Sequence, residues 1–313
     1  MKDFAYTRAR SVAEAVSSQG KFVSGGTDLL NLMKDGVESH DLIVDINGLP
    51  LRGIAVSGPV LSIGALARMS DVASHPLVRQ SFPVLSEALL DSASPQIRNM
   101  AAVGGNLLQR TRCGYFRDIA SPCNKRVPGS GCPALDGENR GHAIFGGGDQ
   151  CIAVHPSDLA VSLLALDASV RTSKRVVRLD DFYLTDPVRE TVLEPGELIT
   201  AIEVPVGRFT SRYLKLRDRA TFEFAVVSVA AALDLRGRRV CDARLTFGGV
   251  APRPWRSTAA EDALRGKDLS AATIAAAASA AVRGAVPRQH NGFKVELVQR
   301  AIKALLTDLG SVR

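Results

Sequence analysis

The chain has 313 residues, with 39 basic against 32 acidic side chains, a net charge of +7 at pH 7 and 46% hydrophobic residues. This composition excludes an intrinsically disordered chain, and the length is typical of two or more domains. No apolar stretch reaches the roughly 20 residues that a membrane-spanning helix needs, so we expect no membrane span. The N-terminus has neither an apolar signal region nor a twin arginine, which predicts a cytoplasmic protein.

The positive charge is concentrated in residues 98–140 and 205–256. Nucleic acid, an anionic cofactor or an acidic protein surface could each account for such an excess. No aromatic residues alternate with the basic ones as stacking platforms, and no helix-turn-helix or zinc-finger spacing occurs. We therefore expect no nucleic-acid partner.

Short helices and strands alternate through the first two thirds of the chain. Ser11 and Glu14 form a capping box that predicts a short helix ending near Gly20. A strand at 21–24 precedes a helix that Thr27 or Asp28 could cap. The further predictions are strands or hairpins at 42–46, 56–64, 169–172 and 197–204, and helices at 70–74, 83–90 and 156–164.

The remainder of the chain has a different pattern. Strands are predicted at 213–216, 226–235 and 243–247, and helices at 258–264, 270–282 and 293–309. Strands followed by helices indicate an α+β domain with an antiparallel sheet. We place the boundary between Pro205 and Ser211, which gives a first domain of residues 1–206 and a smaller second domain of residues 207–313.

Two segments, 22–29 and 101–107, bring a Gly-Gly pair to the end of an apolar, strand-like run. Paired glycines let the backbone approach a ligand and expose N–H groups that can hold phosphate oxygens. Two ordinary tight turns would give the same pattern. Neither segment has the glycine spacing of a Rossmann fold or a P-loop, so neither of those folds is predicted.

Four of the five cysteines, Cys113, Cys123, Cys132 and Cys151, lie in one segment, and Cys241 stands alone in a predicted buried strand. Disulfides are disfavoured in a chain of this size without an export signal. The smallest gap between neighbouring cysteines is eight residues, wider than the about two to four of a zinc knuckle. An iron–sulfur cluster tolerates wide spacing, so a cluster and a purely structural role both stay open.

Several motifs follow one another along the chain: SGGTDL at 24–29, PQIRNM at 95–100, VGGN at 103–106, SDLA at 157–160, ELITAIEVP at 197–205 and FAVVSVA at 224–230. Their order resembles that of the FAD-binding medium subunit of molybdenum hydroxylases, the family of xanthine dehydrogenase and carbon monoxide dehydrogenase. The resemblance implies an oxidoreductase of α+β class. Its fold would be a two-subdomain PCMH-type FAD-binding domain followed by a smaller C-terminal domain of antiparallel sheet and helices.

The resemblance also implies roles for single residues. The FAD pyrophosphate would be held by the first glycine loop, formed by Phe22, Val23, Ser24, Gly25, Gly26, Thr27, Asp28 and Leu29. A second wall of the site would come from Gly104, Gly105 and Asn106. Asp158 would contact the adenosine end of FAD, and Ile199 and Lys215 would line the flavin. Ala102 departs from the family, which usually has Thr or Ser there, so no hydroxyl contact is expected at that position.

The cysteine segment, with RCGYFRD at 112–118 and GCPALDG at 131–137, resembles an insertion in a subset of these subunits. The insertion would span about 110–152, and it is similar to that of bacterial aldehyde oxidoreductase medium subunits and, more distantly, of 4-hydroxybenzoyl-CoA reductase. The resemblance implies a [4Fe-4S] cluster held by Cys113, Cys123, Cys132 and Cys151.

The implied protein is an electron-transfer subunit of an aldehyde oxidoreductase or xanthine dehydrogenase-type complex, with no catalytic residue of its own. A large partner subunit would carry molybdenum-pterin and a small one [2Fe-2S] clusters, in a heterotrimer or a multiple of it. Electrons would leave FAD for an external acceptor, and the absence of a nicotinamide fingerprint disfavours NAD. Co-export on a partner with a twin-arginine signal would place the complex in the periplasm. The alternative is a non-redox nucleotide-binding module with a structural zinc site.

Overall fold

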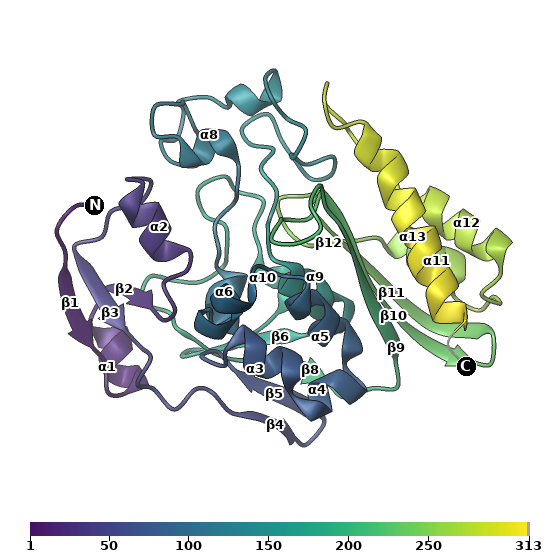
Figure 1. Ribbon diagram of the computed structural model, residues 1–313, viewed down its shortest axis with the longest axis horizontal. Coiled ribbons are helices and arrows are strands. Elements are labelled where there is room, and N and C mark those ends of the chain that lie inside the picture. The colour runs from purple at the N-terminus through teal and green to yellow at the C-terminus, as the bar shows by residue number, and fades with distance from the viewer. Residues whose placement is uncertain (312–313) are drawn as a thin grey trace.

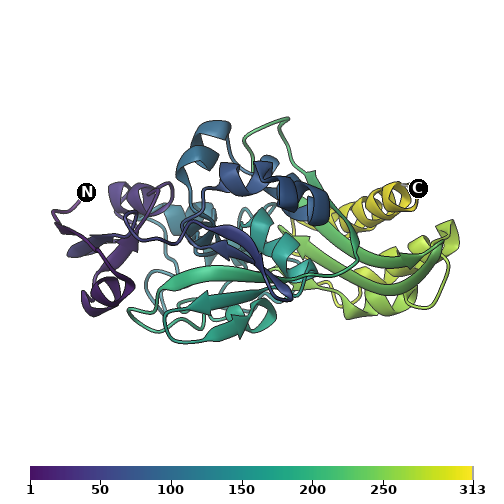
Figure 2. The same cartoon turned by 90° about the horizontal axis from the view of Figure 1, so that it is seen from below.

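The computed structural model describes residues 1–311, in which the strands form three sheets (Figure 1). Seen from below, the N-terminal unit, the central sheet and the C-terminal sheet follow one another along the long axis (Figure 2). None of the described helices combines the length and the apolar character that crossing a membrane would require.

The N-terminal unit is a small parallel sheet with two helices. Its strands lie in the order β1 (Ala5–Arg8), β3 (Leu42–Asp45) and β2 (Lys21–Val23), connected through α1 (Val12–Ser17) and α2 (Leu29–Lys34). The predicted capping box is confirmed, because Ser11 Oγ accepts a hydrogen bond from the Glu14 backbone N–H at 3.1 Å. The Glu14 carboxylate in turn accepts one from the Arg10 backbone N–H at 2.8 Å.

The central sheet is antiparallel and has the strand order β4 (Ile54–Ser57), β5 (Val60–Gly64), β8 (Ile199–Pro205), β6 (Ser169–Thr172) and β7 (Val176–Arg178). Its accompanying helices are α3 (Met69–Ser74), α4 (Pro76–Ser81), α5 (Pro83–Leu90), α6 (Pro95–Met100), α7 (Val103–Leu107), α9 (Asp158–Ala165) and α10 (Leu179–Phe182). Helix α9 is buried at every position. A helix buried all round belongs to the interior of a protein, and α9 contributes Leu159 and Leu163 to the largest hydrophobic core.

The C-terminal sheet is also antiparallel and consists of β12 (Trp255–Arg256), β11 (Arg239–Gly248), β10 (Val227–Arg236) and β9 (Thr210–Leu216), followed by α11 (Thr258–Leu264), α12 (Ala271–Ala281) and α13 (Phe293–Ser311). Alternate residues of β10 face different cores: Ala230 and Ala232 pack with the central sheet, whereas Val229 and Ala231 pack with the C-terminal helices. The sheet is therefore covered on both faces, which explains the long apolar run of β10.

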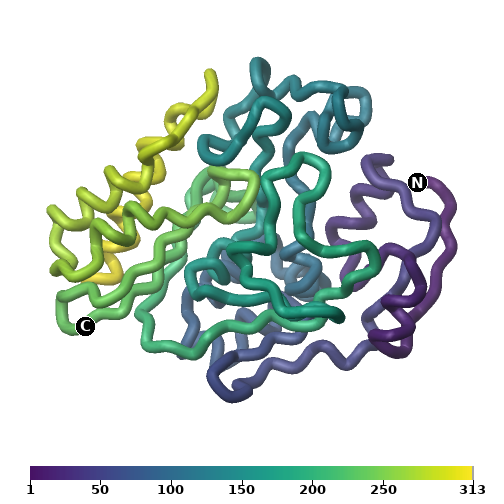
Figure 3. The backbone as a smooth tube through the Cα atoms, turned by 180° about the vertical axis from the view of Figure 1, so that it is seen from behind, coloured from purple at the N-terminus to yellow at the C-terminus, as the bar shows by residue number. Residues whose placement is uncertain are grey.

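The cysteine-bearing segment between α7 and α9 has little regular structure beyond α8 (Gly114–Arg117) and a 3-10 turn, η1 (Pro133–Leu135). It lies at the top of Figures 1 and 3, above the glycine loops. Phe116 and Cys123 pack on Leu32 of α2, and the Asn139 side-chain oxygen accepts a hydrogen bond from the His290 backbone N–H beside α13. The segment thus joins the N-terminal unit to the C-terminal helices.

The α+β class, with two units followed by a C-terminal antiparallel sheet, is confirmed, but three local predictions are wrong. The run before Gly104 is not a strand, because Val103 starts helix α7. Asp28 stands at the N-cap of α2 without capping it, since its carboxylate is engaged elsewhere. Cys241 on β11 is half-buried rather than buried.

Candidate functional site

A cavity of about 670 Å³ opens between the N-terminal unit, the central helices and the loop that joins β9 to β10. Its walls include the first glycine loop, α7, the start of α9 and Lys215 of β9. A volume of this size lies within the range of pockets that enclose a cofactor. The three parts of the chain therefore share one large site.

The glycines of the first loop are required by the backbone around them. A Cβ on Gly25 would stand 2.0 Å from the Met100 carbonyl oxygen, and Gly26 has a φ of +69°. Ser24 is fixed through Asn47, whose side-chain amide donates to the Ser24 carbonyl at 3.0 Å. The first glycine loop is thus packed directly against the chain that leads into the second.

The two glycines of α7 have different surroundings. A Cβ on Gly104 would lie 2.9 Å from the Ala65 side chain, so this glycine permits close packing on the neighbouring chain. A Cβ on Gly105 would meet no atom within 4 Å, and Gly105 lines the cavity. Of the pair, only Gly105 keeps room for a ligand.

Asp28 brings a negative charge into the first glycine loop, and arginines surround it. Its Oδ1 accepts hydrogen bonds from Arg112 and, at 2.9 Å, from Arg117, and its Oδ2 accepts one from the Arg110 backbone N–H at 2.8 Å. These bonds offset the negative charge of Asp28 beside the loop. They also explain why the Asp28 side chain leaves the N-terminus of α2 uncapped.

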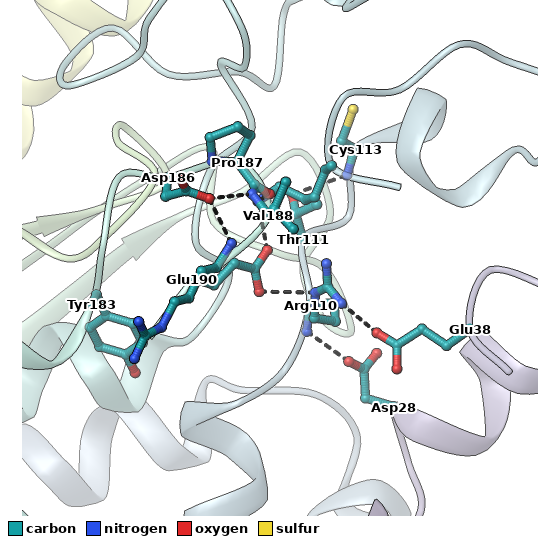
Figure 4. Close-up of polar contacts among 12 residues, drawn as sticks. Asp28, Glu38, Arg110, Thr111, Cys113, Tyr183, Asp186, Pro187, Val188 and Glu190 are labelled. Atoms are coloured by element: carbon teal, nitrogen blue, oxygen red, sulfur yellow. Dashed lines mark hydrogen bonds and ion pairs between the residues drawn. The ribbon is translucent and has the colours of Figure 1, made fainter. Parts of the chain in front are cut away.

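Arg110 connects this loop with two further carboxylates (Figure 4). Its guanidinium donates to Glu38, lies 2.9 Å from Glu190 Oε2 and stacks 4.8 Å from the centre of the Phe116 ring. Burial alone would raise the pKa of Glu38, but His40 and the nearby cations outweigh it and hold the pKa at about 2. Glu38 therefore stays ionised over the physiological range.

Asp158 and Lys215 form a buried ion pair on the cavity wall. Lys215 Nζ donates to Asp158 Oδ2 at 2.8 Å. The side chain of Lys215 is 1% exposed and that of Asp158 is 6% exposed. The Tyr213 hydroxyl donates to Asp158 Oδ1 at 2.5 Å, and burial followed by this carboxylate raises the pKa of Tyr213 well above 10. Ser157, not Asp158, caps helix α9, so the Asp158 carboxylate is available to these partners.

Most of the predicted cofactor residues line this cavity, namely Phe22, Val23, Ser24, Gly25, Gly26, Thr27, Asp28, Leu29, Gly105, Asn106, Asp158 and Lys215. Gly104 lies behind the wall, and Ile199 is buried in the core on β8 rather than at the cavity. Sequence reasoning missed Phe222 and Phe224 of the β9–β10 loop. Phe224 begins one of the motifs noted above, whereas nothing in the sequence distinguishes Phe222.

The four clustered cysteines line a second, smaller cavity together with His142 and Lys125. All four are free of disulfides. Burial raises the pKa of Cys113 to about 11. Within residues 1–311, no three His, Cys, Asp or Glu side chains are arranged to hold a single metal ion.

Comparison with known families decides the identity of the chain. Residues 2–207 match the FAD binding domain in molybdopterin dehydrogenase, and residues 212–309 match the CO dehydrogenase flavoprotein C-terminal domain. The chain belongs to the FAD-binding medium subunits of the molybdenum hydroxylase family. Such a medium subunit is part of a multi-subunit oxidoreductase with large and small partner subunits.

Individual medium subunits resemble it over more than four fifths of their length. The aldehyde oxidoreductase FAD-binding subunit PaoB of Escherichia coli is 45% identical, with 98% of both chains covered. The glyceraldehyde dehydrogenase medium chain of Sulfolobus acidocaldarius is 30% identical, covering 86% of this chain and 83% of its own. The solved structure of carbon monoxide dehydrogenase from Hydrogenophaga pseudoflava matches with a TM-score of 0.77 at 27% identity. The match covers 98% of this chain and 96% of the other.

Proposed function

We propose that this medium subunit holds FAD in the large cavity and transfers electrons from the [2Fe-2S] clusters of the small subunit to an external acceptor. The observation that carries the proposal is the convergence of both glycine loops, Asp158 and Lys215 on one cavity. FAD supplies the ability to take up two electrons, where an iron–sulfur cluster passes one at a time. The chain's own residues bind and orient the cofactor, and none of them contacts the organic substrate.

The cavity fits an elongated dinucleotide with an anionic centre. Residues 24–29 and the open side of Gly105 line the same cavity, and the pyrophosphate would lie against them. Arg112 and Arg117 offset the charge of Asp28 at this point. The Asp158–Lys215 pair would contact FAD at another part of the wall. We retain residues 1–206 and 207–313 as the proposed division into domains.

We further propose that Cys113, Cys123, Cys132 and Cys151 bind a [4Fe-4S] cluster. All four cysteines line the second cavity. The gaps between them along the chain are wider than the about two to four residues of a zinc knuckle, whereas iron–sulfur clusters tolerate wide spacing, which supports a cluster over zinc.

The substrate class is proposed from the relatives. PaoB and the Sulfolobus protein are named for aldehyde oxidation, so we assign an aldehyde-oxidising complex. An aldehyde and water give a carboxylic acid, two protons and two electrons, and those electrons would reach FAD through the partner clusters. We propose an acceptor other than NAD, in the cytoplasm or, by co-export with a partner, in the periplasm. The alternative of a non-redox module gains no support from the family.

The test is cofactor analysis of the purified complex. We expect FAD absorbance together with four irons and four acid-labile sulfides per medium subunit, beyond those of the small subunit. Cys113→Ser and Cys132→Ser should lower iron and sulfide while leaving FAD bound, and Cys241→Ser serves as the control because Cys241 lies outside the cysteine cavity. Unchanged iron in both variants would overturn the cluster assignment, and a complex without flavin would overturn the FAD site.

A further inference from the structure

The imidazole of His142 contacts one of the four clustered cysteines. Its Nε2 lies 3.2 Å from Cys113 Sγ, and the residue is 8% exposed. Among the hydrogen bonds of residues 1–311, His142 provides the one side-chain contact to a sulfur of these four cysteines, and Cys151 receives only a backbone N–H, from Ala153.

The backbone of His142 is held from two sides. Its N–H donates to the Asn139 carbonyl at 2.9 Å, and its own carbonyl accepts from Lys294 Nζ at 2.9 Å and from the Asn291 amide at 3.3 Å. Lys294 is fully buried, and its ammonium also donates to the Gly249 carbonyl at 2.7 Å. The ring of His142 is thus attached to a fixed backbone rather than to a mobile loop.

The direction of the hydrogen bond follows from the state of the cysteine. A cysteine that ligates iron is a thiolate and carries no proton. The proton between the two atoms must therefore reside on Nε2, and the imidazole donates to the sulfur. The other ring nitrogen, Nδ1, is buried without a hydrogen-bond partner in the described structure, so Cys113 is the ring's polar partner.

We propose that His142 is a positioning residue that tunes the [4Fe-4S] cluster, by donating a hydrogen bond from Nε2–H to the Cys113 thiolate and thereby raising the cluster's midpoint potential. The inference rests on the cluster proposed above. Reduction adds negative charge that is shared with the sulfur ligands, so a donor at the sulfur stabilises the reduced state more than the oxidised state. His142 acts through Cys113 and is not itself a ligand, since four cysteines complete the set.

Redox titration of the purified complex, followed by electron paramagnetic resonance, tests this inference. His142→Phe keeps an aromatic ring but removes the donor. At a fixed potential, the ratio of reduced to oxidised cluster should fall about tenfold, which corresponds to about 59 mV for a one-electron couple. His142→Gln carries an amide N–H at a similar reach and should restore most of the wild-type potential.

His155→Phe is the matched control. His155 is also a histidine near the cluster segment, but it is half-buried, its ring packs at a tilt against Tyr183, and in the described structure its Nε2 has no hydrogen-bond partner. Its substitution should leave the cluster potential unchanged, and none of the variants should move the FAD couple. If His142→Phe loses iron, His142→Leu provides a second donor-free side chain for the same measurement.

Three results would overturn the inference. The first is a wild-type cluster potential in a variant that lacks the donor but keeps its full iron content. The second is a cluster potential in His142→Gln that is as low as in His142→Phe, which would indicate that packing and not the hydrogen bond sets the potential. An equal shift in His155→Phe would indicate a general effect of burial. A wild-type complex without the extra four irons would overturn the proposed cluster itself, which separates that failure from a failure of the tuning role.

Discussion

Lys215 Nζ lies 2.8 Å from Asp158 Oδ2, and the two residues are separated by 57 positions in the chain. Lys215 lies on the C-terminal sheet, whereas Asp158 begins helix α9 of the central unit. The ion pair therefore joins the two units at the wall of the large cavity. A site formed in this way depends on the docking of the C-terminal sheet.

Removing one member of this pair should leave the other as an uncompensated buried charge. We expect Lys215→Met and Asp158→Asn each to lower the free energy of unfolding by about 3–5 kcal/mol. The double variant should lose less than the sum, because neither charge then remains unpaired. Urea denaturation of the full chain measures all three, and strictly additive losses would contradict the coupling.

Gly105→Val separates cofactor binding from folding. The new side chain would enter open space in the cavity without a clash, and glycine in a helix interior costs about 0.5–1 kcal/mol relative to alanine. We therefore expect stability in the absence of FAD to be retained while the FAD content of the purified protein falls sharply. Gly53→Val, at an exposed glycine with equal free space, is the control. A full flavin content in Gly105→Val would reject the position of the cavity wall.

The loss of stability at low pH should depend on Glu38 and Asp45. The folded pKa of each is about 2, against ordinary values of 4.5 and 3.8, because charged and hydrogen-bonding partners outweigh the effect of burial. A lowered pKa contributes stability above the unfolded value, and that stability is lost as the pH falls toward 2. Between its unfolded and its folded pKa, each group should add up to about 1.4 kcal/mol per pH unit to the slope of the unfolding free energy against pH.

Glu38→Gln and Asp45→Asn should each flatten the dependence of the unfolding free energy on pH. Urea denaturation at several pH values from about 5 down to about 2 measures this dependence. Glu138→Gln is the control, because Glu138 is exposed and its side chain makes no ion pair in the described structure. An unchanged slope in both test variants would show that other carboxylates control acid unfolding.

Arg110→Lys should loosen the contacts of residue 110 with Glu38 and Glu190 although it keeps the charge. A lysine ammonium cannot reach both Glu38 and Glu190 while also stacking on Phe116, and loss of the hydrogen bond to the Glu38 carboxylate costs about 1.5–3 kcal/mol. Hydrogen exchange should accelerate in residues 28–38 and 186–190. Arg171→Lys, at an exposed pair with Glu203, should show no such change.

Local sequence signals predicted much of this fold. The capping box of Ser11 and Glu14 and the apolar run of β10 act over a few residues, so they can be read directly from the chain. The contacts of arginines with Asp28 could not be predicted in this way, because Arg112 lies 84 positions away in the chain. The different roles of Gly104 and Gly105 also depend on distant neighbours: Ala65 packs on the first, and empty space faces the second.

The contact between Lys294 and His142 spans 152 positions, from the last long helix back to the cysteine segment. During synthesis on the ribosome, both glycine loops and all four clustered cysteines emerge well before Lys294 does. The cysteine cavity can take its final shape only once the C-terminal helix has been released and has docked. The order of translation therefore makes this cavity a late-forming part of the subunit, and a prematurely terminated chain would display the four thiols without the contact that fixes them.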